Sequence, residues 1–172
     1  MRRSTATLGS LGWFVLSAGV GVVWVPWLVT GWDVRYQSSW WLVAQVVGAA
    51  LVAAGLVPVV ATFVRFARAS GTPVPGAMPA RLVVTGPNRY VRNPIYVGVL
   101  VILVGETLLL GQPALLLYAA ALWAGVAIFV RGYEEPTLLR RFGAEYEEYR
   151  RAVPAWVPRR RPWSPGEVSR SR

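Results

Sequence analysis

The amino-acid sequence predicts an all-α integral membrane protein with about four transmembrane helices and a cytoplasmic amphipathic C-terminal helix. Three observations support this prediction. The 172 residues are 55% hydrophobic, their apolar residues come in long uncharged blocks, and the arginines lie almost entirely on one side of a four-helix path. A bilayer core of about 30 Å needs roughly 20 helical residues. Lipid offers no water to an open backbone edge, which favours helices.

Four blocks are long enough, or nearly so, to cross a membrane. Residues 11–30 and 40–64 carry no charge, residues 95–111 carry one acidic side chain, and residues 114–131 carry one arginine at their end. We expect one helix in each block. The first block should be retained and not cleaved as a signal peptide, because it is long and lacks an A-x-A cleavage site.

Glu106 is the acidic residue inside the third block, 11 residues after Ile95. At 1.5 Å per helical residue it lies about 16 Å from the start of the block. A carboxylate at that depth costs roughly 2.5–3.5 kcal/mol, so it should face a bundle interior or reach the headgroups. The first position would make Glu106 a candidate for the lining of a substrate tunnel. The nearby turn at Gly111 favours the second.

The distribution of arginine predicts the orientation of the chain. All 18 basic residues are arginine, and 17 of them precede the first block, separate the second from the third, or end or follow the fourth. Cytoplasmic loops carry the excess of positive charge. We therefore expect a multi-pass protein of the cell (inner) membrane with cytoplasmic N- and C-termini. The arginine-only composition suggests GC-rich coding and a bacterial source.

A net charge of +10 could also indicate a nucleic-acid partner. No basic stripe alternates with stacking aromatic residues, so we expect none. The chain has no Cys and no His, which removes thiolates, the commonest general base and the commonest metal ligand. No metal site is predicted. A single domain should occupy residues 1–158, followed by a disordered basic tail over residues 159–172, which has no apolar period.

The first segment with potential for ligand binding covers residues 82–98. Pro94 is placed at the first turn of the third helix, where its missing N–H costs nothing. The positive end of the helix dipole, with Arg89 and Arg92 nearby, should favour an anion such as a ligand carboxylate. The alternative is a loop that anchors lipid headgroups and does nothing more.

The second segment predicts an amphipathic cytoplasmic helix over about residues 136–152, because apolar residues recur every three or four positions. Glu134 and Glu135 stand where the chain leaves the fourth block. A carboxylate there could bind a cation or ribose hydroxyls, and we expect this of Glu134. For Glu135 we expect a solvated helix end. The apolar positions are Leu138, Leu139, Phe142, Tyr146, Tyr149 and Val153.

Both segments, in this order and separated by an apolar hairpin, resemble the isoprenylcysteine carboxyl methyltransferase family and its phospholipid-methyltransferase relatives. The resemblance covers residues 81–158. Its pattern closes on V-P-x-x-x-P, which stands here at residues 153–158. The matching positions are Leu82, Val83, Gly86, Arg92, Pro94, Tyr96, Val97, Gly98, Glu134, Glu135, Phe142, Gly143, Glu145, Tyr146, Tyr149, Val153, Pro154 and Pro158.

The resemblance implies a membrane methyltransferase that uses S-adenosyl-L-methionine. The cofactor would enter from the cytosol, and a lipidic or apolar acceptor would enter from the bilayer. Arg131 is the candidate catalytic residue that orients the acceptor. The implied cofactor-binding residues are Arg81, Leu82, Val83, Asn88, Asn93, Pro94, Ile95, Tyr96 and Glu134.

Two positions depart from the family pattern. Its His is Asn93 here, and its usual Tyr after Gly-Pro is Asn88. The Asn93 amide can still donate a hydrogen bond to the cofactor carboxylate, but it cannot act as a base. Activity is therefore expected if the family His serves in binding. Methyl transfer needs positioning more than acid–base chemistry, and the lack of His slightly favours an acceptor that is already anionic.

Two alternative functions remain open from the sequence. The first is a non-catalytic membrane module whose basic loop binds anionic lipid. The second is an NADPH-dependent membrane reductase, since some sterol reductases share a similar C-terminal motif. Affinity for S-adenosylmethionine distinguishes the methyltransferase from both. The sequence leaves the acceptor and the oligomeric state open.

Overall fold

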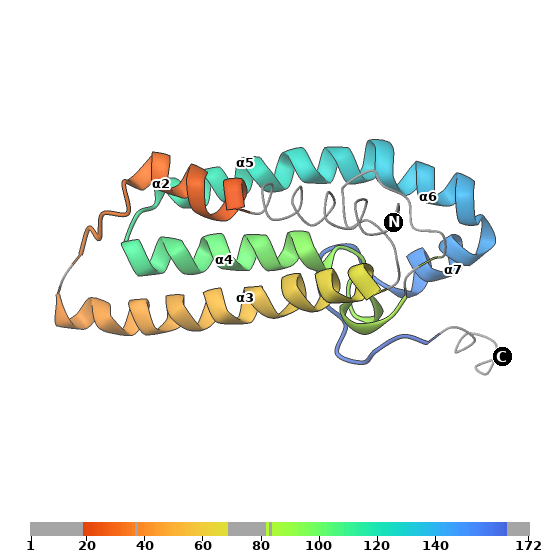
Figure 1. Ribbon diagram of the computed structural model, residues 1–172, viewed down its shortest axis with the longest axis horizontal. Coiled ribbons are helices and arrows are strands. Elements are labelled where there is room, and N and C mark those ends of the chain that lie inside the picture. The colour runs from red at the N-terminus through yellow and green to blue at the C-terminus, as the bar shows by residue number, and fades with distance from the viewer. Residues whose placement is uncertain (1–18, 37, 69–81, 83, 165–172) are drawn as a thin grey trace, which may run out of the picture.

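A computed structural model describes residues 19–36, 38–68, 82 and 84–164. In this part of the chain all regular elements are helical, and the long helices lie side by side in an elongated bundle (Figure 1). The predicted all-α fold is confirmed for these residues. In chain order the α-helices are α2 (Val25–Thr30), α3 (Leu42–Arg68), α4 (Pro94–Leu110), α5 (Ala114–Phe129), α6 (Glu135–Phe142) and α7 (Ala144–Ala152). Short 3-10 turns η2 (Ser39–Trp41) and η3 (Gly86–Arg89) and π-helical turns η1 (Val20–Trp24) and η4 (Val130–Glu134) adjoin them.

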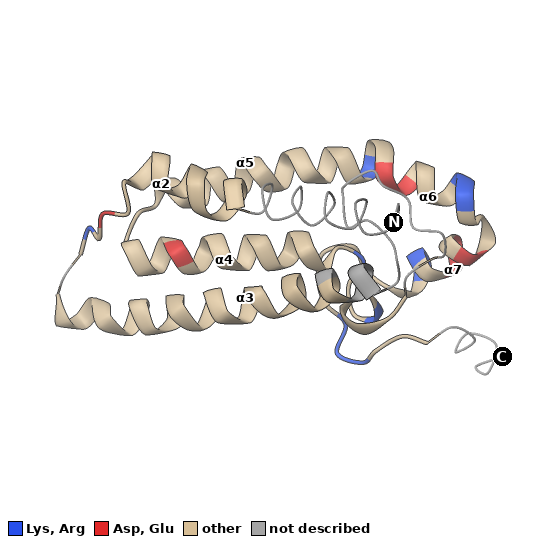
Figure 2. Cartoon of the chain, in the orientation of Figure 1, with Lys and Arg blue, Asp and Glu red and all other residues tan. Residues whose placement is uncertain are grey.

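The exterior of the bundle is apolar. Two helical stretches, Ser39–Thr62 and Ala114–Phe142, are long and apolar enough to cross a membrane, and two shorter apolar stretches, Val20–Thr30 and Pro94–Leu110, lie beside them. Large apolar side chains cover the outer faces, and Leu117 is 76% exposed. Figure 2 shows charges gathered at the α6–α7 end, a smaller group after α2, and helices almost free of charge between them. Such a surface indicates a membrane protein, because soluble monomers rarely expose large apolar patches.

Two pairs of glycines bring α3 and α4 into backbone contact. A Cβ atom on Gly55 would lie 2.6 Å from the carbonyl oxygen of Gly98, and one on Gly48 would lie 2.6 Å from that of Gly105. On both helices the glycines are seven residues apart, so both contacts form in a single antiparallel register. Small residues allow membrane helices to approach closely and pack. The sequence interpretation missed this seam, although the repeated spacing in two apolar blocks was a detectable signal.

The turn between α4 and α5 is tied to the segment that joins α2 to α3. Gly111 ends α4 in the left-handed region, with φ of +67°. The backbone N–H of Arg35 donates to the carbonyl oxygen of Leu110 at 2.8 Å. Nearby, the Gln112 side-chain amide donates to the carbonyl oxygen of Asp33 at 3.0 Å. These contacts fasten the end of the bundle that lies away from α6 and α7.

Glu106 lies inside the bundle, with 6% of its surface exposed. Tyr118 on α5 is within electrostatic range, and the Tyr118 hydroxyl donates to the carbonyl oxygen of Gly21 at 2.9 Å. The favoured expectation that Glu106 reaches the headgroups is therefore wrong. Its position in α4 turns the side chain towards neighbouring helices and away from the surface.

The amphipathic region that follows the fourth apolar block consists of two helices where one was predicted. In Figure 1, α6 continues the line of α5 beyond the start of α4, and α7 turns back. The break falls at Gly143, whose φ of +52° and ψ of −124° are readily adopted by glycine and strained for other residues. The apolar periodicity continues across the break, which is why the sequence suggested one helix.

The chain beyond α7 packs against the loop that precedes α4. The backbone N–H groups of Arg159 and Trp163 donate to the carbonyl oxygens of Tyr90 and Arg89, each at 2.9 Å. Trp163 is only 4% exposed and packs in an aromatic cluster with α7. The predicted disorder is therefore wrong for residues 159–164, because a buried tryptophan and two backbone hydrogen bonds hold an otherwise polar stretch. Residues 165–172 lie outside the described residues.

Candidate functional site

The predicted binding loop lies at the start of α4, and Asn93 is the residue that caps this helix. Pro94 is buried in the first turn. Asn93 is 8% exposed, and its Nδ2 donates to the carbonyl oxygen of Ala155 at 3.2 Å. One amide hydrogen of Asn93 therefore holds the segment after α7. Within residues 19–36, 38–68, 82 and 84–164, the second amide hydrogen and Oδ1 of Asn93 are the groups left for a ligand.

Asn88 connects the loop to α7. Its main-chain carbonyl oxygen accepts a hydrogen bond from the Tyr149 hydroxyl at 2.7 Å. Burial raises the pKa of this hydroxyl, so Tyr149 remains a neutral donor. The Oδ1 atom of Asn88 is buried and has no partner among the described residues. Leu82 packs against the same aromatic cluster, whereas Arg81 and Val83 lie outside the described residues.

Glu134 has a buried carboxylate oxygen that is open to a hydrogen-bond donor from a ligand. It is the last residue of η4, a π-helical turn, whose wider backbone changes the direction of the following side chains. Its Oε2 is buried and has no hydrogen-bond partner in the described part of the chain. Tyr96, in the first turn of α4, lies within electrostatic range. A buried acceptor without a donor is costly, which makes Glu134 a natural ligand for an incoming N–H or O–H group.

Glu135 has the opposite environment, and the expectation of a solvated helix end is wrong. Its Oε1 lies 2.6 Å from Nη1 of Arg92, and the two side chains are only 16% and 12% exposed. The same guanidinium nitrogen donates to the Tyr146 hydroxyl at 3.2 Å. The ion pair joins the start of α6 to the loop before α4. The sequence could not show it, because the partners are 43 positions apart.

We expect Glu135→Gln to lower the free energy of unfolding by about 3 kcal/mol, because it leaves the largely buried Arg92 charge without its counterion. Thermal unfolding in detergent measures the loss. The matched control is Glu147→Gln, since Glu147 pairs with the more exposed Arg150 and Arg151. Surface pairs contribute about 0–1 kcal/mol. Equal losses in the two variants would contradict a structural role for the Arg92–Glu135 pair.

The structure does not bring Arg131 into this set of contacts. Arg131 lies in η4 and its side chain is exposed. Among the described residues it forms no ion pair. Ile95 and Tyr96 are half-buried in the first turn of α4. The structure therefore gathers Asn88, Asn93, Tyr96 and Glu134 around the start of α4, with Arg131 on the outer side of η4.

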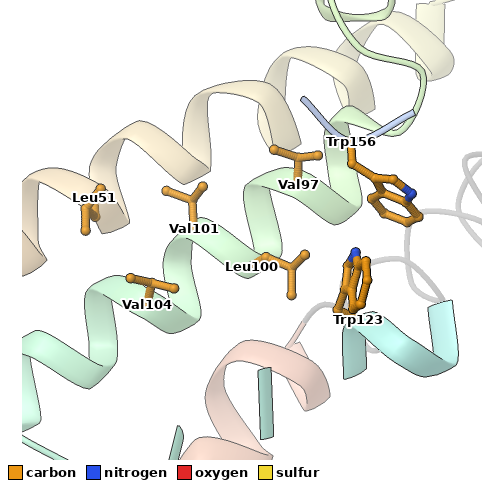
Figure 3. A pocket seen from close by; sticks show the side chains of 7 residues that line it. All are labelled: Leu51, Val97, Leu100, Val101, Val104, Trp123 and Trp156. Carbon is orange, nitrogen blue, oxygen red and sulfur yellow. The ribbon is translucent and has the colours of Figure 1, made fainter. Parts of the chain in front are cut away.

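An apolar pocket of about 220 Å³, here called the apolar groove, lies beside α4 (Figure 3). Its walls come from α3, α4, α5 and the segment after α7. The rings of Trp123 and Trp156 meet edge to face, with centroids 6.2 Å apart and planes at 69°. Sequence reasoning singled out neither tryptophan. The lining residues are Leu51, Val97, Leu100, Val101, Val104, Trp123 and Trp156.

Comparisons with known proteins agree with the resemblance found in the sequence. The chain is 38% identical over 78 residues to the Protein-S-isoprenylcysteine O-methyltransferase of Schizosaccharomyces pombe. This stretch is 45% of the chain, and it spans 33%, or about a third, of the length of that relative. A family model described as phospholipid methyltransferase matches residues 43–145, more than half of the chain. The chain therefore belongs to the phospholipid methyltransferase family.

Proposed function

We propose that this protein transfers a methyl group from S-adenosyl-L-methionine to a lipidic or apolar acceptor at the cytoplasmic face of the membrane. The observation that carries the proposal is the buried Oε2 of Glu134 beside the start of α4, which has no partner among the residues that the structure describes. Family membership supports the reaction class, and the name of the Schizosaccharomyces pombe relative supports an acceptor that carries an apolar chain.

The polar groups at the start of α4 are suited to this cofactor. S-adenosylmethionine has ribose hydroxyls and an amino group, which would donate to Glu134 and to the unpartnered Oδ1 of Asn88. The dipole of α4 favours the cofactor carboxylate near Asn93. The full proposed set is Arg81, Leu82, Val83, Asn88, Asn93, Pro94, Ile95, Tyr96 and Glu134.

The reaction asks for positioning more than for acid–base groups. When bound, S-adenosylmethionine would supply a methyl group on a positively charged sulfonium sulfur, which leaves as a neutral thioether when an acceptor lone pair takes the methyl carbon. The loop and Glu134 would orient the donor, and the apolar groove would hold the chain of the acceptor. Arg131 would orient an anionic acceptor head. Correct placement of both reactants can supply roughly 7–11 kcal/mol.

In the membrane we place four spans, formed by residues 11–30, of which 19–30 are described, and by α3, α4 and α5. The 17 residues of α4 cover about 25 Å at 1.5 Å per residue, enough for a slightly thin or locally adapted bilayer. The arginines at the α6–α7 end support a cytoplasmic position for that end (Figure 2). The domain would then lie in the inner membrane of a bacterium with both termini in the cytoplasm.

The test uses the full chain in lipid nanodiscs. We expect saturable binding of S-adenosylmethionine in calorimetry and transfer of tritium from its labelled methyl group into the organic phase of a bacterial lipid extract. NADPH is the comparison ligand. Binding of NADPH without binding of S-adenosylmethionine, or binding of neither, would reject the proposal.

A further inference from the structure

We propose that Trp156 determines which acceptors the enzyme takes, because it closes the end of the apolar groove that faces the candidate cofactor site. The inference rests on the proposed function and names a selecting residue for that same site. Trp156 comes from the segment after α7, so it reaches the groove from a part of the chain that is distant from the other walls in sequence.

The position of Trp156 follows from the course of the groove along α4. The groove extends from Val97 to Val104, about 10 Å along the helix axis. Asn93, the residue before α4, donates to the carbonyl oxygen of Ala155, the residue before Trp156, so this end of the groove lies at the same end of α4 as the candidate cofactor site. Figure 3 shows Trp156 near Val97 and Trp123 beyond Leu100, with the two indoles at the same end. An acceptor chain in the groove would direct its reacting head past this pair.

Two hydrogen bonds hold Trp156 in this position. The carbonyl oxygen of Ala155 accepts from Nδ2 of Asn93 at 3.2 Å, and that of Pro154 accepts from the backbone N–H of Arg92 at 2.9 Å. Both donors belong to residues immediately before α4. The main chain that carries Trp156 is thus tied to the helix end where the groove begins, and the indole packs edge to face against Trp123.

Trp156 also differs from the rest of the lining in its relation to the family. The other six lining residues lie within residues 43–145, which the family model matches, and Trp156 lies beyond them. It occupies a free position of the V-P-x-x-x-P pattern at residues 153–158. The part of the chain that the family model matches supplies six lining residues, and the segment beyond it supplies the seventh. A rigid indole there selects against bulk next to the reacting group of the acceptor.

The experiment compares two acceptors that differ at this point. They are hexadecylthioacetic acid and its analogue with two methyl groups beside the carboxylate, offered to the full chain in nanodiscs with tritiated S-adenosylmethionine. The parent should prefer the unbranched acid. Trp156→Ala should reduce the ratio of the two kcat/KM values by about tenfold, the effect typical of a methyl-sized change in an apolar pocket. The ratio cancels any change in cofactor binding.

Val157→Ala is the matched control, because Val157 is 73% exposed, and it should leave the ratio unchanged. Asn93→Ala removes the donor to Ala155 and should shift the ratio in the same direction as Trp156→Ala. If Trp156→Ala leaves the ratio of the two kcat/KM values at the parental value, the inference is overturned, even if methyl transfer is normal.

A second readout needs no turnover. Competition of the two acids against a brominated hexadecyl acid, which quenches tryptophan fluorescence, gives their relative affinities. If the parent transfers no methyl group but Trp156→Ala narrows the affinity ratio, the proposed function fails and the selecting role of Trp156 stands. If neither acid competes, the groove does not hold acceptor chains and the inference is rejected.

Discussion

Gly98→Leu should lower the free energy of unfolding by about 3 kcal/mol, because it forces a side chain into the contact between α3 and α4. A Cβ atom at this position would lie 2.6 Å from the carbonyl oxygen of Gly55 and 2.7 Å from Cγ2 of Val59. The first neighbour is backbone and cannot move aside without separating the helices. Thermal unfolding in detergent measures the effect.

Gly125→Leu is the control for this prediction. Gly125 lies in α5, and a Cβ atom there would meet nothing within 4 Å among the described residues. The same change in side chain should therefore shift the free energy of unfolding by no more than about 0.5 kcal/mol. If Gly125→Leu destabilised the protein as much as Gly98→Leu, the loss would come from the leucine itself and not from the glycine seam.

Glu134→Gln should weaken binding of S-adenosylmethionine by tenfold or more and leave the fold intact. A hydrogen bond to a charged group contributes about 1.5–3 kcal/mol, which corresponds to at least tenfold in affinity. The chain itself gives Oε2 of Glu134 no partner among the described residues. Removing an unpaired, largely buried charge should therefore maintain or slightly raise the melting temperature. Calorimetry and thermal unfolding on the same sample measure both effects.

Glu135→Gln provides the opposite pattern, because that carboxylate is paired with Arg92. Glu135→Gln should lower the free energy of unfolding, whereas Glu134→Gln should lower the affinity for S-adenosylmethionine. If Glu134→Gln instead lowered the melting temperature and left the affinity for S-adenosylmethionine unchanged, Glu134 would support the fold and would not belong to the cofactor site.

The sequence was informative wherever a short stretch determines its own structure. The uncharged blocks predicted the helices, because a bilayer constrains length and backbone pairing within each segment. The helix break at Gly143 and the ordered segment around Trp163 could not be predicted in this way. The helix break depends on one positive φ angle inside a continuous apolar period, and the ordered tail depends on one tryptophan that finds a cluster elsewhere in the chain.

The candidate site was predictable to a similar extent. The family pattern selected Asn93 and Glu134, and their role in cofactor binding stays a prediction. The sequence could not reveal that Glu135 is held by Arg92 or that Asn93 holds Ala155, since both contacts join distant segments. It also could not indicate that Trp123 and Trp156 meet beside the same groove. Each of these features is tertiary, and a single sequence without related sequences carries no record of such pairs.

The long helix that runs from α5 through η4 into α6 is held at two places. At one end, the Gly111 turn is tied to the segment that joins α2 to α3 through Arg35 and Gln112. At the other end, the Arg92–Glu135 pair joins the start of α6 to the loop before α4. Trp123 stands between these ties, as the tenth residue of α5, about 15 Å from the Gly111 turn. If the ion pair were lost, a tilt of about 10° about that turn would move the Trp123 ring by roughly 2–3 Å relative to Trp156.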